Sequence, residues 1–166
     1  KAALRPALLA FTLSVAAPAL FAHGEAKHGQ PKAAAPISTE EHAFGKQGDP
    51  NKATRSIVID MTDMMRFAPR EITVKQGETI KFVVANKGKL MHEMVIGTME
   101  ELKKHGALMK QHPEMEHDEP YMAHVSPGTK EAMVWQFTNE GEFHYACLVP
   151  GHFEAGMIGK IKVMKG

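Results

Sequence analysis

Short runs of β-branched and other apolar residues, each bounded by a turn signal, constrain the fold of this chain more than any other feature. Three runs cover 56–60, 71–74 and 79–85, and pairs such as Ala68-Pro69 and Gln76-Gly77 separate them. Four more cover 90–96, 131–137, 142–147 and 158–164. Strands of this length and spacing predict an all-β domain over 54–166, folded as a Greek-key β-sandwich or barrel.

One insertion, 98–124, interrupts this series of predicted strands. Thr98 followed by Glu101 has the pattern of a helix N-cap and capping box, and apolar residues then recur at helical spacing up to Met109. We therefore expect one short helix followed by an irregular loop.

The segment 147–157 places a thiol, an imidazole and a thioether at five-residue intervals, in Cys147, His152 and Met157. A strand that ends at Cys147 would fix the sulfur, and a turn at Gly151 would bring His152 back over it. Gly156 would then let Met157 approach at the start of the next strand. The segment can wrap around one small ion.

A fourth ligand has to come from elsewhere in the chain, and His92 is the natural candidate because its strand can neighbour that of Cys147. Two histidines, one cysteine and a weak axial methionine form the ligand set of a type 1 copper site. Structural zinc usually draws four stronger ligands and no thioether. The residues therefore predict one copper ion as the cofactor, held by His92, Cys147, His152 and Met157.

The segment 147–157, together with an upstream His92 followed by Glu93-Met94, resembles the plastocyanin and azurin group of cupredoxins, and the resemblance covers 54–166. Segments 65–69, 75–79 and 86–88 are more particularly similar to periplasmic cupredoxins associated with bacterial copper tolerance. The resemblance implies a cupredoxin-type Greek-key fold and a copper protein without catalytic residues.

The first 22 residues have the features of a secretory signal peptide. Lys1 and Arg5 precede an apolar run over 8–17, and small residues end it near Ala22. The run is shorter than the roughly 20 residues that a membrane span needs, which disfavours the alternative of an uncleaved anchor. We expect export to the periplasm, with no membrane span after cleavage.

Charge and cysteine content limit the partners and the roles that the exported protein can have. Cleavage after Ala22 would remove two of the 20 basic residues and none of the 19 acidic ones, so the formal charge would change from +1 to −1. A nearly neutral protein is a poor binder of nucleic acid. Cys147 is the only cysteine, so no internal disulfide can form and this exported thiol needs another role.

Residues 23–53 are rich in Ala, Gly, Pro, Lys and His and show no sustained apolar period. We interpret them as a flexible arm. His23, as a new N-terminus, would offer an amine and an imidazole to Cu(II), with His28 and His42 nearby; an uninvolved tail is the alternative.

Ten histidines and twelve methionines are many for this length, and several of them lie in the insertion. His105, Met109 and His112 would share one helix face, which suggests an additional copper ion. The alternative is a helix that covers the barrel through Met99, Leu102 and Met109, with solvated histidines.

Three classes of function remain. The first is a non-enzymatic copper protein that acts in copper tolerance, in one-electron transfer, or in both. A periplasmic redox protein such as a cytochrome would then dock at His152, inside an apolar rim of Leu148, Val149, Pro150 and Phe153. The second is a fragment or subunit of a copper enzyme related to nitrite reductases or multicopper oxidases, although the chain lacks the paired His-x-His motifs of a second centre. The third, a purely structural sandwich, leaves the spacing of the ligands unexplained.

Overall fold

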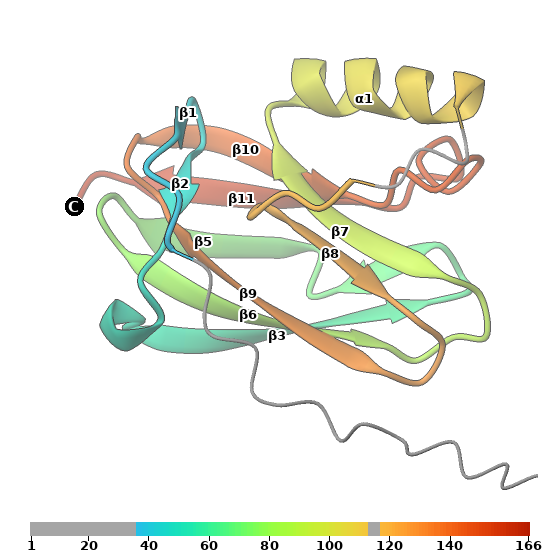
Figure 1. The fold of residues 1–166 in the computed structure, drawn as a ribbon, viewed down its shortest axis with the longest axis horizontal. Helices are drawn as coiled ribbons and strands as arrows, with labels where there is room; N and C mark the ends of the chain where they lie inside the picture. Colours follow the sequence, from blue (N-terminus) through green and yellow to red (C-terminus); the bar gives the residue numbers. More distant parts are fainter. Residues whose placement is uncertain (1–35, 113–116) are drawn as a thin grey trace, which may run out of the picture. The chain divides into compact units, whose positions relative to one another are not determined.

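Two β-sheets pack face to face in the structure, a computed structural model that describes residues 36–112 and 117–166 (Figure 1). The predicted signal peptide, 1–22, and the first part of the predicted arm, 23–35, lie outside the described residues. In spatial order, the six-stranded sheet contains β1 (Glu41–His42), β2 (Gly45–Gln47), β9 (Lys130–Gln136), β6 (Thr79–Asn86), β3 (Arg55–Thr62) and β4 (Arg66–Ala68). The five-stranded sheet contains β5 (Glu71–Lys75), β11 (Ile158–Met164), β10 (Gly141–Ala146), β7 (His92–Gly97) and β8 (Met122–Val125).

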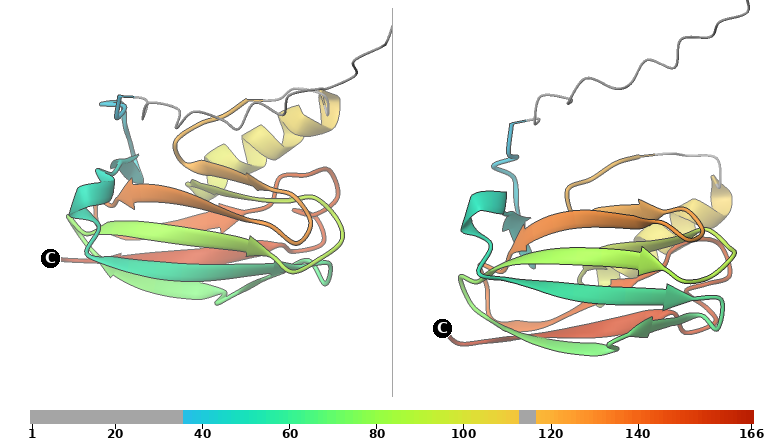
Figure 2. Two further views of the ribbon diagram at one scale, coloured as in Figure 1. Left: turned by 60° about the horizontal axis from the view of Figure 1, so that its bottom comes forward. Right: turned by 90° about the horizontal axis from the view of Figure 1, so that it is seen from below.

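The order of the strands confirms the predicted all-β sandwich. Each of the seven predicted runs forms a strand, and strands distant in sequence become neighbours: β3 pairs with β6, and β5 with β11, both in parallel. The other pairs are antiparallel, including β7 with β10. Figure 2 shows the two sheets as separate layers.

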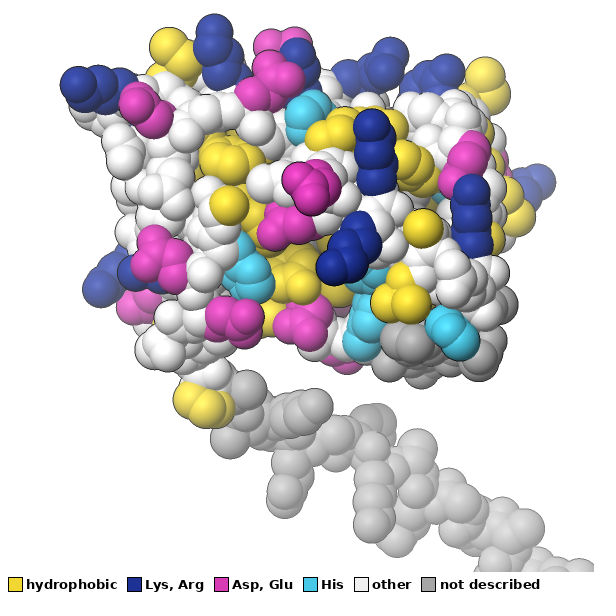
Figure 3. Space-filling view, turned by 90° about the horizontal axis from the view of Figure 1, so that it is seen from above, with side chains coloured by type: hydrophobic (Ala, Val, Ile, Leu, Met, Phe, Trp, Pro, Cys, Tyr) yellow, Lys and Arg dark blue, Asp and Glu magenta, His cyan; other side chains and the backbone are white. Residues whose placement is uncertain are grey.

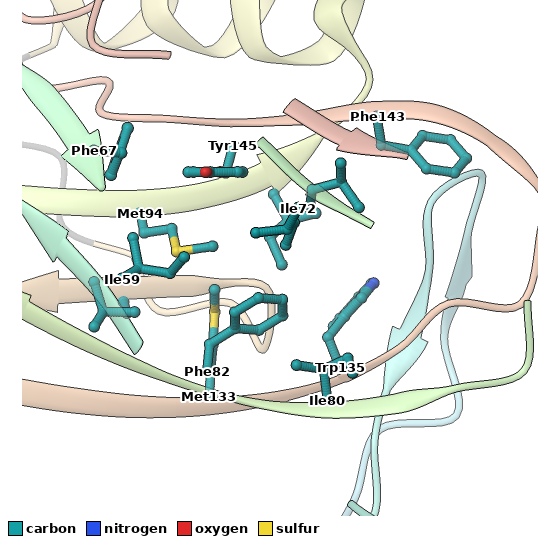
Figure 4. Packing of buried hydrophobic residues seen from close by; sticks show 14 of the residues in the cluster. Ile59, Phe67, Ile72, Ile80, Phe82, Met94, Met133, Trp135, Phe143 and Tyr145 are labelled. Atoms are coloured by element: carbon teal, nitrogen blue, oxygen red, sulfur yellow. The ribbon is translucent and has the colours of Figure 1, made fainter. Parts of the chain in front are cut away.

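The core lies between the sheets because their strands alternate buried and exposed residues. In β5, Ile72 and Val74 are buried while their neighbours are exposed, which is the period of two that a half-buried strand requires. Large side chains from both sheets meet in this layer (Figure 4), and they include Ile59, Phe67, Phe82, Met94, Met133, Trp135 and Tyr145.

The insertion contains the predicted helix, α1 (Met99–Gln111), and its start is set locally. The Thr98 side chain accepts a hydrogen bond from the Glu101 N–H, and the Glu101 carboxylate accepts one from the Thr98 N–H, which makes a capping box. The helix buries Leu102, Gly106 and Met109 against the outer face of the second sheet. No helix in the described ranges is long and apolar enough to cross a bilayer.

The prediction of an irregular loop after this helix was wrong at the end of the insertion, where residues 122–125 form β8. This strand pairs with β7, so that Val125 lies opposite His92 and His124 opposite Glu93. Only four residues pair, at the edge of the sheet, and so short a run lacks a clear alternating pattern.

The prediction of a flexible arm over 23–53 was also wrong for the second half of that segment. Residues 36–53 belong to the same compact unit as the rest of the domain, and β2 pairs with β9. Phe44 is buried and stacks on Trp135 at 5.3 Å between ring centroids, while the Trp135 indole N–H donates to the Phe44 carbonyl at 2.9 Å. Gly45 follows at φ +121°, where an added Cβ would lie 2.1 Å from the Gln136 carbonyl oxygen. Two residues with specific contacts therefore anchor a segment whose composition is that of a linker.

Candidate metal centre

Three of the predicted ligands converge inside the domain. The Cys147 sulfur lies 3.2 Å from Nδ1 of His152 and 4.0 Å from Nδ1 of His92, and the three candidate ligand atoms all lie within 4.8 Å of one another. Ligand atoms that bind one ion at about 2.0–2.3 Å are separated by about 3.3–4 Å. The three side chains are therefore spaced to share one ion.

Strand pairing brings these residues together from distant parts of the sequence. Cys147 directly follows β10, whose Phe143 and Tyr145 point into the core on the same side as Cys147. The neighbouring strand β7 begins at His92, and the backbone N–H of Glu93 donates to the Cys147 sulfur at 3.4 Å. The sheet thus fixes the sulfur and the first imidazole before the loop adds the second.

The loop 147–157 folds back on itself through backbone hydrogen bonds. The Met157 N–H donates to the His152 carbonyl, and the Cys147 N–H donates to the Met157 carbonyl, both at 3.1 Å. Gly151 and Gly156 have φ values of +90° and +83°, which favour glycine. Met157 is fully buried directly before β11 and packs in the same core cluster as Cys147. The loop thus brings Met157 back beside Cys147, whereas the three atoms spaced to share one ion are those of His92, Cys147 and His152.

Asp63, between β3 and β4, orients the first imidazole from outside. Its carboxylate oxygen Oδ1 lies 3.1 Å from Nε2 of His92, and the two oxygens accept the N–H groups of Lys89 and Leu90. These backbone hydrogen bonds hold the pKa of Asp63 below its usual value. An ionised carboxylate at Nε2 favours a proton there and leaves Nδ1, the nitrogen that faces the sulfur, free to bind a metal ion.

Glu93 is a buried carboxylate that ties the strand of one ligand to the loop of the others. It is 3% exposed, and its Oε1 accepts the Leu148 N–H at 2.8 Å while its Oε2 lies 3.0 Å from Nδ1 of His124. The hydrogen bond that the His124 ring donates to Glu93 is the main cause that raises the pKa of His124. Carboxyl groups are rarely buried in folded proteins unless they are paired in this way.

The titration behaviour of the ligands suits a cation. Burial raises the pKa of the Cys147 thiol to about 12, so without a metal ion the thiol carries its proton at neutral pH. Burial, and then the neighbouring His92, lower the pKa of His152, which keeps that imidazole neutral and able to bind. Binding of a soft cation would therefore displace the thiol proton.

Sequence reasoning missed the roles of Asp63 and Glu93. Asp63 lies 29 residues before His92 and in no recognisable pattern with it, whereas Glu93 was noticed only as the neighbour of a ligand. The expected apolar rim around His152 also needs one correction. Leu148 is 1% exposed and packs with Val95 and Leu102 beneath α1, because its side chain points to the outer face of the sheet.

Comparison with known proteins identifies the class to which this fold and site belong. Residues 53–164 match the family described as copper binding proteins, plastocyanin/azurin family. The chain belongs to this cupredoxin family, and copper is its cofactor. The donor set fits that ion, since a thiolate and two imidazoles are the strong ligands of a type 1 site.

Individual relatives show a more specific similarity within this family. The chain is 45% identical over 160 residues to the copper-resistant cuproprotein CopI of Rubrivivax gelatinosus, a match that covers 96% of each chain. It is 35% identical to the CopI protein of Pseudomonas aeruginosa, with 73% of this chain and 82% of that protein covered.

Solved structures of auracyanins share the fold. Auracyanin B has a TM-score of 0.62 at 16% identity, with 72% of this chain and 96% of that chain covered. The reduced auracyanin of Roseiflexus castenholzii has a TM-score of 0.59 at 22% identity, with 68% and 98% covered.

Proposed function

We propose that His92, Cys147, His152 and Met157 hold one type 1 copper ion, and that the protein acts in the periplasm in copper tolerance. The convergence of two imidazole nitrogens on a buried thiol is the observation that carries the proposal. The name of the relatives, copper-resistant cuproprotein, supports the tolerance role, because one of them aligns over almost the whole chain. The N-terminal features of a signal peptide support export.

The described residues would keep copper away from other molecules. Cys147 and Met157 are fully buried and His152 is 9% exposed, so an ion between them would have little contact with solvent. Asp63 and Glu93 hold the first imidazole and the ligand loop in place before any ion binds. A preformed, shielded site binds copper tightly and limits its reactions with other thiols.

Growth in copper tests the tolerance role. We expect a bacterial strain without this gene to become copper-sensitive, and the wild-type chain, but not the His152→Ala variant, to restore growth. Immunoblots of periplasmic fractions would show that both proteins are exported in equal amounts. Equal restoration by the variant would refute a tolerance role that depends on this site.

One-electron transfer is a second candidate function, supported by the surface near the ligands. His152 retains slight exposure beside the half-buried Val149 and Phe153. Three apolar side chains on the loops joined by Asp63 are also exposed, namely Met64, Leu90 and Met91. Such a patch suits docking of a redox protein such as a cytochrome. Stopped-flow mixing with a reduced c-type cytochrome would show rapid oxidation that slows when Met91 is replaced by Glu, and unchanged rates would argue against docking here.

The proposal includes the absence of catalytic activity, and the alternative of an enzyme related to nitrite reductases or multicopper oxidases can be tested directly. We expect the copper-loaded protein to show no turnover of nitrite or dioxygen with a chemical reductant. Multiple turnovers that disappear in the His152→Ala variant would favour the enzyme.

Removal of the Asp63 carboxylate is expected to weaken copper binding. Asp63→Ala should lower the affinity by about 10–100-fold, the usual cost of losing a group that orients a ligand histidine. Competition with a chelator of known affinity would measure this. Asp60→Ala is the matched control, because Asp60 is a partly exposed carboxylate in β3, the strand that Asp63 follows, and has only a long ion pair to Lys87. Equal affinities in the two variants would contradict the role given to Asp63.

Copper(II) binding is expected to release one proton from Cys147. Because the pKa of this thiol is about 12, the apparent affinity should rise by about tenfold per pH unit between about pH 6 and pH 8. Proton release in weakly buffered solution would measure the effect, and Cys147→Ser would serve as the control. An affinity independent of pH would show that the site already holds a thiolate.

A further inference from the structure

A second group of histidines lies on the other side of the β7–β8 pair from the core, between α1 and the segment before β8. His105 on α1 and His117 approach each other so closely that their Nε2 atoms are 2.9 Å apart, with ring centroids at 4.7 Å. Neither residue takes part in the copper centre described above. Two ring nitrogens that face each other either share a proton or can share a metal ion.

A shared proton satisfies this pair only in part. If the Nε2 atoms share one hydrogen bond, Nδ1 of His117 stays buried and has no hydrogen-bond partner in the described part of the chain. Buried polar atoms of this kind are uncommon in folded proteins and call for an explanation. A hydrogen bond between the Nε2 atoms therefore leaves the polar atoms of this pair only partly satisfied.

The backbone of His117 is held in place by a chain of contacts that starts at Glu93. Glu93 pairs with His124, and Nε2 of His124 lies 3.1 Å from the carbonyl oxygen of His117. Metal-binding histidines are commonly positioned by such outer contacts, which lower the cost of ordering the ligand. The same carboxylate thus supports both groups of histidines.

Opposing influences surround His105. Burial, and then the charges of His117 and His124, lower the pKa of this imidazole. The carboxylates of Glu93 and Glu119 act in the opposite direction and attract positive charge to this place. A metal ion brings that charge without requiring protonation of either ring.

Both histidines line a pocket of about 590 Å³ between α1 and the β1–β2 segment, together with His42 and Tyr121. On the face that carries α1, histidine side chains lie beside an apolar area and close to acidic groups (Figure 3). An ion held by His105 and His117 would therefore keep coordination positions open towards the pocket. Such a site can exchange its ion more readily than the buried centre.

We propose that His105 and His117 form an accessory site for a first-row transition-metal ion, with copper as the metal that it binds most tightly. Two imidazoles suit copper, nickel and zinc, and the general order of affinities puts Cu(II) first. The site is separate from the ligands of the type 1 centre and does not depend on the function proposed for them.

Copper stoichiometry in matched variants tests the accessory site. Four full-length proteins would be compared by equilibrium dialysis against Cu(II) and by electron paramagnetic resonance: wild type, His105→Gln, His117→Gln and His112→Gln. His112 is the matched control, because it is exposed and follows the last residue of the same helix. We expect His105→Gln and His117→Gln each to bind one copper ion fewer than His112→Gln and to lose one colourless Cu(II) signal.

The visible band of the type 1 centre serves as the check on folding, and it should be the same in all four proteins. Loss of this band in every protein, with the difference in stoichiometry retained, would refute the function proposed above and leave the accessory site standing. Equal copper content in all four proteins would overturn the accessory site. In case a variant fails to fold, nuclear magnetic resonance of the wild type gives a second measurement. Cu(II) should broaden the ring signals of His105 and His117 before that of His112, and broadening in the opposite order would also overturn the proposal.

Discussion

Replacement of Cys147 by serine is expected to abolish the intense visible absorption of the copper-loaded protein. That absorption arises from charge transfer between a thiolate and Cu(II), and Cys147 is the only cysteine in the chain. Its sulfur lies 4.0 Å from Nδ1 of His92 and 3.2 Å from Nδ1 of His152, the position of the thiolate ligand. Serine is similar in size, and the fold should persist. The loss in Cu(I) affinity should exceed the roughly 10–100-fold expected for a residue that only orients a ligand.

Met157→Leu is the matched control for this experiment. Met157 is buried in the same loop, but the axial thioether of a type 1 site binds weakly and mainly tunes the redox potential. We therefore expect the leucine variant to keep an intense band with a shifted position. An intense band in the Cys147→Ser protein would show that the thiol is not a ligand.

Replacement of Phe44 by alanine is expected to destabilise the metal-free domain by about 3–5 kcal/mol, the usual cost of deleting a buried aromatic side chain. Phe44 is 2% exposed and stacks on Trp135, which closes one side of the core. Urea unfolding followed by the fluorescence of Trp135, the only tryptophan, would measure the change in the free energy of unfolding.

Ile37→Ala provides the comparison from the same segment. Ile37 is 44% exposed, so its truncation should change stability by well under 1 kcal/mol. A flexible arm over 23–53 would predict the same small effect for both variants. A large effect of Phe44→Ala alone would place the start of the cooperative domain before Phe44, as the packing indicates.

Features encoded in contiguous residues could be predicted from the sequence. Runs of β-branched and other apolar residues bounded by turn signals predicted the strands of the sandwich, and the Thr98 and Glu101 pair predicted the start of α1. Both signals depend on neighbours along the chain. The spacing of Cys147 and His152 indicated one loop, and the structure brings their ligand atoms to 3.2 Å.

Features that depend on contacts between distant segments could not be predicted in the same way. Asp63 contacts His92 across 29 residues of sequence, and Glu93 contacts Leu148 across 55. No periodic pattern in the sequence indicates either contact. Phe44 stands alone among small and polar residues, so that composition indicated a linker. Its burial depends on Trp135, which lies 91 residues further along the chain.

X-ray absorption at the copper edge tests the central claim most directly, because it counts the atoms bound to the ion. The protein loaded with one equivalent of copper should show one sulfur at about 2.2–2.3 Å and two nitrogens at about 2.0 Å, the distances typical of thiolate and imidazole ligands. These atoms would be Sγ of Cys147 and Nδ1 of His92 and His152. A copper ion surrounded only by nitrogen and oxygen would contradict the site described for this protein.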